Sequence, residues 1–215
     1  MKYFGISLLS TLSVAVILMA TSCQSPTSST STSTTSTTTV TDSSKIGFES
    51  GYTVSSVTAN ESDVKGGTMG MTFTLSAAQK NTGAQSLECQ GTSQQNAYST
   101  DFFGEASIPV PSAPVDFTGK SITIAIFVPT GSEVSAVNLT LIDANGKQTL
   151  LQQQNTTPGK WATMTFAPIA ANIIYQDTGA SIATTNTLRL RFETTNSAGT
   201  AVSAPVDAFV DSINW

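Results

Sequence analysis

The residues that most often carry out catalysis are sparse in this 215-residue sequence. It contains no histidine, which excludes Ser-His-Asp triads, Cys-His pairs and histidine-ligated zinc sites. No GxSxG motif, phosphate-binding loop or glycine-rich dinucleotide fingerprint occurs. Paired carboxylates can hydrolyse a glycoside, but the acids are scattered, and the best-placed pair, Glu49 and Asp211, favours a structural role. The sequence therefore predicts a protein that is not an enzyme.

Glu49 and Asp211 lie near opposite ends of residues 45–215. Phe209, Asp211, Ile213 and Trp215 are spaced two residues apart. Asp211 is therefore expected on the same face of the last strand as these apolar residues, where an unpaired carboxylate is costly to bury. Two carboxylates together with turn carbonyls form a hard oxygen site that suits Ca²⁺. Alternatively, each acid lies at the solvated rim or pairs with a basic side chain.

Three aromatic residues outside the expected core are candidates for sugar binding. Tyr98 and Tyr175 lie in segments without a clear apolar period, and Trp161 follows a Pro-Gly turn. Ligand sites combine apolar and aromatic walls with a few polar groups, and Arg189 and Arg191 occupy the polar positions of LRLRFE. The alternatives stay open: the tryptophan packs at a strand start, the tyrosines cover loops, and the arginines form a cross-strand ion pair on a solvated face.

The elements that must position these side chains are strands. Apolar residues alternate with polar or small ones, which is typical of a strand with one buried face, and Gly, Asn and Pro turns separate the runs. The clearest runs are 69–75, 121–128, 137–142, 162–166 and 188–193. Segments 137–142 and 148–152, joined across Asn145-Gly146, predict a hairpin. Short, regularly spaced strands over residues 45–215 predict an all-β fold, a β-sandwich or jelly roll.

The first 44 residues have a different composition. The uncharged apolar run 8–20 is too short to span a membrane and is typical of a signal peptide. The small residues that follow fit ordinary signal-peptidase cleavage; placed directly before Cys23, they also resemble the lipobox of bacterial lipoproteins. We expect a signal peptide over 1–22 and a lipid anchor at Cys23. The Ser/Thr-rich tract to residue 44 is expected to be a disordered tether, because it cannot bury enough apolar surface to fold.

The charge of the sequence argues against one class of partner. The formal net charge is −5, and no cluster of lysine and arginine occurs. Nucleic-acid phosphates require a basic face, so we expect no nucleic acid as a partner.

Seven short motifs follow one another in a characteristic order: IGFESG, GAQSLECQG, DFTGKSITIAIFVPTG, VNLTLIDANGK, GKWATMTF, LRLRFE and FVDSINW. Together they resemble the galactose-binding-like β-jelly-roll of many carbohydrate-binding modules of polysaccharide-degrading enzymes, over essentially all of residues 45–215. The resemblance implies one structural Ca²⁺. Its carboxylate ligands would be Glu49 of the FE motif and Asp211 of the VDS motif, with carbonyl ligands at Gly47 and in the turn near 82–83.

The resemblance implies a non-catalytic polysaccharide-binding module. Its candidate ligand-binding residues are Tyr98, Trp161, Tyr175, Arg189 and Arg191. The protein is expected to be exported and anchored to a membrane, in the periplasm or at the cell surface. The alternative is a structural or adhesive surface lipoprotein whose β-sandwich binds a protein partner, and an apolar patch on one face would favour it.

Overall fold

The computed structural model describes residues 45–49, 51–60 and 63–215. The signal peptide, the lipid anchor at Cys23 and the tether expected over residues 1–44 lie outside the described residues and stay predictions. Within the described part of the chain, no helix is long and apolar enough to cross a membrane.

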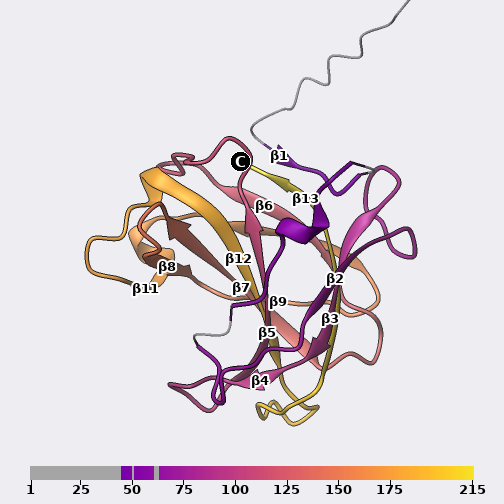
Figure 1. Cartoon of the computed structure of the whole chain (residues 1–215). Coiled ribbons are helices and arrows are strands. Elements are labelled where there is room, and N and C mark those ends of the chain that lie inside the picture. The colour runs from indigo at the N-terminus through magenta and orange to yellow at the C-terminus, as the bar shows by residue number, and fades with distance from the viewer. Residues whose placement is uncertain (1–44, 50, 61–62) are drawn as a thin grey trace, which may run out of the picture. The chain divides into compact units, whose positions relative to one another are not determined.

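Two antiparallel sheets form the molecule (Figure 1). Sheet A has the strand order β10-β6-β13-β3-β2, and β1 pairs with β13. Its strands are β1 (Lys45–Ile46), β2 (Thr72–Ser76), β3 (Ser86–Thr92), β6 (Ile122–Phe127), β10 (Trp161–Phe166) and β13 (Pro205–Asn214). Sheet B has the order β11-β8-β7-β12-β5-β4, and β9 pairs with β7. Its strands are β4 (Gln94–Gln95), β5 (Phe102–Pro109), β7 (Val134–Asp143), β8 (Gln148–Leu151), β9 (Gln154–Asn155), β11 (Ile173–Gln176) and β12 (Thr185–Thr194).

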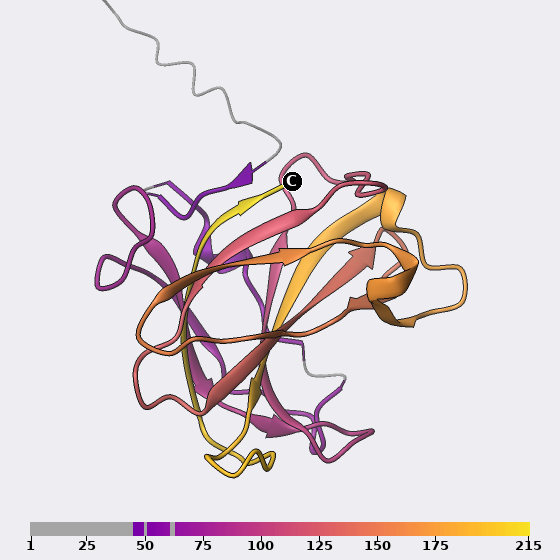
Figure 2. The same ribbon diagram turned by 180° about the vertical axis from the view of Figure 1, so that it is seen from behind.

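The prediction of an all-β sandwich is confirmed. The described helical elements are three short 3-10 turns, η1 (Val54–Ser56), η2 (Ala170–Asn172) and η3 (Ile182–Thr184). The hairpin expected across Asn145-Gly146 is formed by β7 and β8. Seen from behind in Figure 2, β1 lies beside the end of the yellow β13, so the two ends of the described chain meet there.

The core lies between the sheets and uses alternate residues of each strand. Its fully buried large side chains include Phe48, Leu87, Phe117, Ile122, Ile124, Ile126, Leu139, Leu141, Phe166 and Phe192. Burial of one such side chain contributes about 1.5–3 kcal/mol before conformational entropy is counted. Since successive side chains of a strand point to opposite faces, the residues between these lie on the outer faces, where ligand sites can form.

The last strand departs from the expected alternation near its end. Between Asp211 and Asn214 the pairing of β13 with β6 shifts by one residue, and Ser212 takes up this bulge with a φ of 47°. Ile213 therefore points into the core together with Val210. The expectation that Asp211 shares the face of Ile213 is wrong, because a bulge reverses the alternation beyond it.

The residues before β2 lie along the β5 edge of sheet B, held by isolated bridges. From them, Val64 and Met69 pack against Phe103 and form a second, smaller hydrophobic cluster. This cluster covers one end of the outer face of sheet B. It also brings Asp63 within reach of the middle strand β12.

Candidate functional site

The middle strand β12 carries a charged floor on the outer face of sheet B. Arg189, Arg191 and Glu193 alternate with the buried core residues of that strand, so their side chains point away from the core. Glu105 of β5 is directly opposite Arg191 in the ladder. The floor is therefore built by cross-strand neighbours.

Glu105 and the two arginines form an ion-pair cluster with Asp63. Arg191 donates from Nε and Nη2 to Glu105 Oε1, at 2.8 and 2.7 Å, and from Nη2 to Asp63 Oδ2 at 3.1 Å. Arg189 Nε lies 3.7 Å from Glu105 Oε2, and the Arg191 guanidinium lies 3.9 Å from the centre of the Phe103 ring, a cation–π contact. Glu105 is fully buried, whereas each arginine side chain is 11% exposed. Of the alternatives that the sequence left open, the cross-strand ion pair is present, but the face around it is largely buried and not an ordinary solvated one.

Burial shifts the pKa values of the acids in this floor. Burial raises the pKa of Glu105, and the positive charges of Arg191 and Arg189 oppose that rise. Burial also raises the pKa of Glu193 from its ordinary 4.5 to about 7; Arg191 lowers it, and Asp101 and Glu105 raise it further. The amide of Asn138 lies against Glu193, with Nδ2 3.4 Å from Oε1.

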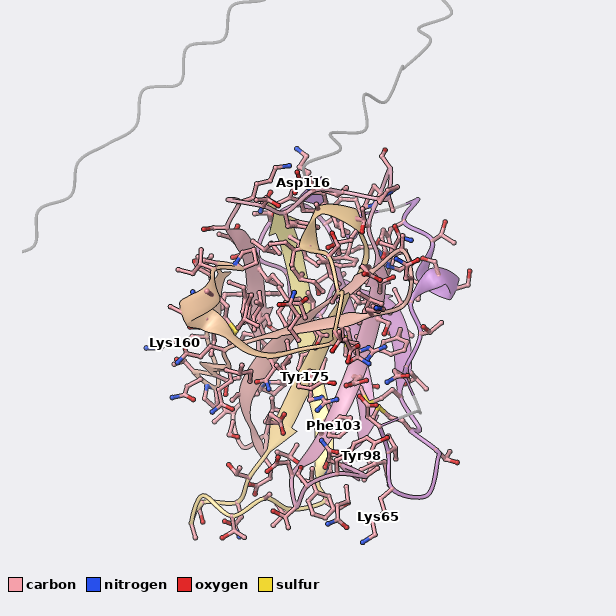
Figure 3. The ribbon with its side chains drawn as sticks, turned by 90° about the vertical axis from the view of Figure 1, so that its left-hand side faces the viewer. Lys65, Tyr98, Phe103, Asp116, Lys160 and Tyr175 are labelled. Atoms are coloured by element: carbon pink, nitrogen blue, oxygen red, sulfur yellow. The ribbon has the colours of Figure 1, made fainter. Side chains whose placement is uncertain are left out.

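Two exposed tyrosines flank the floor. Tyr98 is 83% exposed between β4 and β5, where its backbone N–H donates to Asn96 Oδ1 at 2.8 Å. Tyr175 is 55% exposed on the edge strand β11, and its hydroxyl donates to Asp177 Oδ1 at 2.6 Å. This hydrogen bond raises the pKa of Tyr175. Figure 3 shows Tyr98 and Tyr175 on the same side of the molecule, with Phe103 between them.

Together these side chains enclose a cleft of about 510 Å³. It is lined by Asp63, Asn96, Tyr98, Thr140, Gln148, Leu150, Tyr175, Asp177 and Arg191. The walls thus combine two aromatic rings with hydroxyl, amide, carboxylate and guanidinium groups. This combination is typical of a site for a small polar ligand with apolar faces.

The structure brings three of the five candidate ligand-binding residues into this cleft: Tyr98, Tyr175 and Arg191. Arg189 lies at the adjoining, smaller pocket of about 250 Å³ on the same sheet face. Trp161 is on the outer face of sheet A, where its ring packs 5.7 Å from the Phe127 ring. The structure therefore does not bring Trp161 together with the two tyrosines.

Several residues of the cleft were missed in the sequence. They are Asp63, Asn96, Thr140, Gln148 and Asp177, together with the buried Glu105 that pairs with Arg191. One signal was available. Phe103, Glu105 and Ser107 are spaced two residues apart in the run FFGEASIP, so a strand there would have placed Glu105 on one face together with Phe103 and Ser107. No comparable signal marks Asp63, because only the packing of its neighbours on Phe103 brings it to β12.

The two carboxylates of the expected calcium site converge on the turn 81–84. Asp211 Oδ2 accepts from the backbone N–H groups of residues 81 and 82, at 3.0 and 2.9 Å, and Glu49 accepts from that of Ala84 at 3.0 Å. Gly83 has a φ of 64°, and a Cβ there would collide with the Glu49 carboxylate. Among the residues that the structure describes, no three acidic or cysteine side chains gather at one point, so further oxygen ligands would be main-chain or amide carbonyls.

Comparisons with known proteins bear on the fold. No protein-family model matches the chain, and no curated protein matches it in sequence. A structure that addresses the promiscuous specificity of carbohydrate-binding modules of the β-sandwich superfamily has a TM-score of 0.51 at 13% identity, over 80% of this chain and 61% of that one. An exo-β-agarase also has a TM-score of 0.51, at 12% identity, over 80% of this chain and 24% of that one.

The CBM22-1 xylan-binding domain of Paenibacillus barcinonensis Xyn10C has a TM-score of 0.46 at 18% identity, over 80% of this chain and 91% of that domain. This chain thus spans about three fifths of the first of these neighbours and about a quarter of the agarase. At these identities the likeness concerns the fold alone. The described chain has the β-sandwich jelly-roll fold that carbohydrate-binding modules among its structural neighbours also have.

Proposed function

We propose that the domain binds carbohydrate without catalysis, through the cleft on the outer face of sheet B. One observation supports this proposal above the others: two exposed tyrosine rings flank a floor of polar side chains. The apolar faces of sugar rings pack on aromatic rings, while hydroxyls exchange hydrogen bonds with groups such as Gln148, Thr140 and Arg191.

The acids around the cleft support binding rather than chemistry. Glu105 and Asp63 are ion-paired to arginines, and Glu105 is fully buried beneath them, so neither carboxylate is free to act on a bound ligand. Glu193, whose pKa is near 7, is not among the residues that line the cleft. Two carboxylates flanking one bond, as glycoside hydrolysis requires, are therefore not part of the proposal.

The test is retention of the full chain on a panel of insoluble and soluble polysaccharides. We expect retention by one glycan class, and Tyr98→Ala or Tyr175→Ala each to lower the affinity about tenfold, which corresponds to about 1.4 kcal/mol. The controls Tyr98→Phe and Tyr175→Phe keep the rings and should keep most of the affinity. Absence of retention on every glycan, from a chain with a cooperative unfolding transition, would overturn the proposal.

A second function is favoured by a separate observation. Ile169, which precedes the edge strand β11, and Ile174, on that strand, are 52% and 58% exposed. Large apolar side chains exposed at a sheet edge are typical of a protein-binding surface. If the glycan panel fails, the structural or adhesive role becomes the better proposal, with this sheet edge as the partner surface.

We further propose a structural Ca²⁺ at the 81–84 turn. Glu49 and Asp211 would supply carboxylate oxygens and Gly47 a carbonyl, and Gly47, Glu49 and Thr82 line one common cavity. A hard cation prefers such oxygen ligands. Bound there, it would tie the first and last strands to the turn and would take no part in chemistry.

Removal of the metal should therefore lower the stability of the fold and leave the side chains of the cleft unchanged. At about 100 times its dissociation constant, calcium should raise the Tm by roughly 5–10 °C over the value in chelator, from a linkage term of about 2.7 kcal/mol. Glu49→Gln should abolish this shift, whereas Glu133→Gln, on another loop, should keep it. An identical Tm with calcium and with chelator would contradict the proposal.

The proposal also includes a lipid anchor at Cys23, which would make the protein a tethered lipoprotein. A lipid on that residue would hold the sandwich near a membrane at the end of a flexible Ser/Thr tract. Fractionation of a Cys23→Ser variant tests it, because loss of the membrane fraction is expected only if Cys23 carries the anchor.

A further inference from the structure

A second groove lies on the outer face of sheet A, on the opposite side of the sandwich from the tyrosine cleft. Its volume is also about 510 Å³. Thr123 and Ala125 of β6 and Thr163 of β10 form its floor, and Thr163 is directly opposite Ala125 in the ladder. The walls come from Lys45–Ile46 and Gly47, Glu49, the turn residues Asn81 and Thr82, and Ser212 and Asn214 of β13.

An aromatic row lies on the same face of sheet A, beyond the residues that line this groove. Trp161 precedes Thr163 by two residues on the same face of β10, about 7 Å along the strand. Its ring lies 5.7 Å from Phe127, and Phe127 lies 6.0 Å from Phe209 on the next strand. Trp161 and Phe127 are only partly buried, so part of this aromatic surface remains exposed beside the groove. Of the five ligand-binding candidates from the sequence, Trp161 is the one that lines neither pocket on sheet B.

The groove offers neutral hydrogen-bonding groups. In the part of the chain that the structure describes, the hydroxyls of Thr123 and Thr163 have no protein hydrogen-bond partner. The hydroxyls of Thr82 and Ser212 are bonded to each other at 2.6 Å, and each keeps further capacity, since a hydroxyl can donate once and accept twice.

The charges at the groove nearly cancel. Its walls carry one lysine, Lys45, and one acid, Glu49. The nearby Asp211 carboxylate is occupied by the backbone N–H groups of residues 81, 82 and 212. Glu49 stands at the end of the groove where the Ca²⁺ is proposed, whereas a neutral polyhydroxyl compound would find hydroxyl and amide partners along the rest of the groove.

We propose that this groove is a second site for neutral sugars, with Thr123 and Thr163 as hydroxyl partners and Trp161, two residues from Thr163 on the same strand face, as a flanking aromatic ring. It shares the ligand class of the proposed function but none of the residues of the tyrosine cleft. Two sites on opposite faces would let one molecule bridge two glycan chains, and such bivalent attachment exceeds either affinity alone.

The test uses the two tryptophans of the chain as separate reporters. Trp215 packs 5.5 Å from Phe117 at the end of the chain, so the indole N–H signal of Trp161 is the one expected to respond. The full chain in detergent solution is titrated with neutral hexasaccharides derived from xylan, cellulose and agarose. We expect the Trp161 signal to shift in the native chain and equally in the Tyr98→Ala/Tyr175→Ala double variant.

Blocking variants decide whether the groove itself is responsible. Thr163 is exposed on an edge strand, so Thr163→Lys should fold, fill the groove and abolish the shift. The matched control Thr74→Lys, an exposed threonine on β2 at the other edge of the same sheet, should leave the shift unchanged. Trp161→Ala should lower the affinity of this site about tenfold, but it also removes packing on Phe127.

The two sites can fail independently. Absence of a Trp161 shift with every hexasaccharide, or a shift that survives Thr163→Lys, would overturn the second site, whatever the tyrosine variants do. Glycan retention that is unaffected by the tyrosine variants but abolished by Thr163→Lys would instead overturn the cleft and leave the groove as the binding site.

Discussion

Replacing Glu105 with glutamine is expected to lower the free energy of unfolding by about 3–5 kcal/mol, the range for removing one partner of a buried ion pair. The glutamine keeps the size of the side chain but removes the negative charge to which Arg191 donates at 2.7 and 2.8 Å. Arg189, 3.7 Å from the same carboxylate, would lose its partner as well. Asp63 alone would then face two guanidinium groups at the base of the cleft.

Urea unfolding at pH 7 measures this effect. Asp116→Asn is the matched control, because it removes one carboxylate charge from an exposed position and should change stability by less than about 0.5 kcal/mol. A loss below about 1 kcal/mol for Glu105→Gln would show that the Glu105 carboxyl is protonated in the native chain. The pairing described for the floor would then be wrong.

Glu193 is expected to make the protein less stable as the pH rises. Its pKa is about 7 in the folded chain, against an ordinary 4.5. Between these values the folded state keeps a proton that the unfolded state has released, so the free energy of unfolding falls as the pH increases. The difference of about 2.5 pKa units corresponds to roughly 3 kcal/mol, complete near pH 8 and absent below pH 4.

A Glu193→Gln variant isolates this contribution. Glutamine cannot ionise, so the variant should match the native chain near pH 4 and exceed its stability by up to about 3 kcal/mol near pH 8. The quantity to measure is the difference between the two unfolding free energies at several pH values, because Asp207, whose pKa burial also raises, contributes to both chains equally. A difference that does not change with pH would contradict the raised pKa of Glu193.

The fold was largely predictable because one periodicity governs it. Runs such as 121–128 and 188–193 alternate apolar and polar residues, and β6 and β12 bury the apolar set. The exception is the end of β13, where the positive φ of Ser212 shifts the register. A bulge there has no marker in the sequence, since serine is not a residue that requires a left-handed conformation.

The candidate site was only partly predictable. Tyr98 and Tyr175 were identifiable as aromatics in polar surroundings, and both line the cleft. Trp161 was a candidate because it follows a Pro-Gly turn, with packing at a strand start as the alternative, and it lies on the other sheet against Phe127. The sequence offers no means to separate them, because strand order, which places β11 and β4 in sheet B and β10 in sheet A, depends on pairing between distant segments.

By itself the sequence determined the secondary structure and the class of fold, since alternation within a strand is a local property that each segment carries. It also determined that Arg189 and Arg191 face outward. Only the tertiary structure decided which acids neutralise them: Glu105, 86 residues away along the chain from Arg191, and Asp63, 128 residues away. Ion pairs between residues so far apart in the chain depend on how the strands pair and on how Val64 and Met69 pack on Phe103. The local pattern of residues does not encode that arrangement.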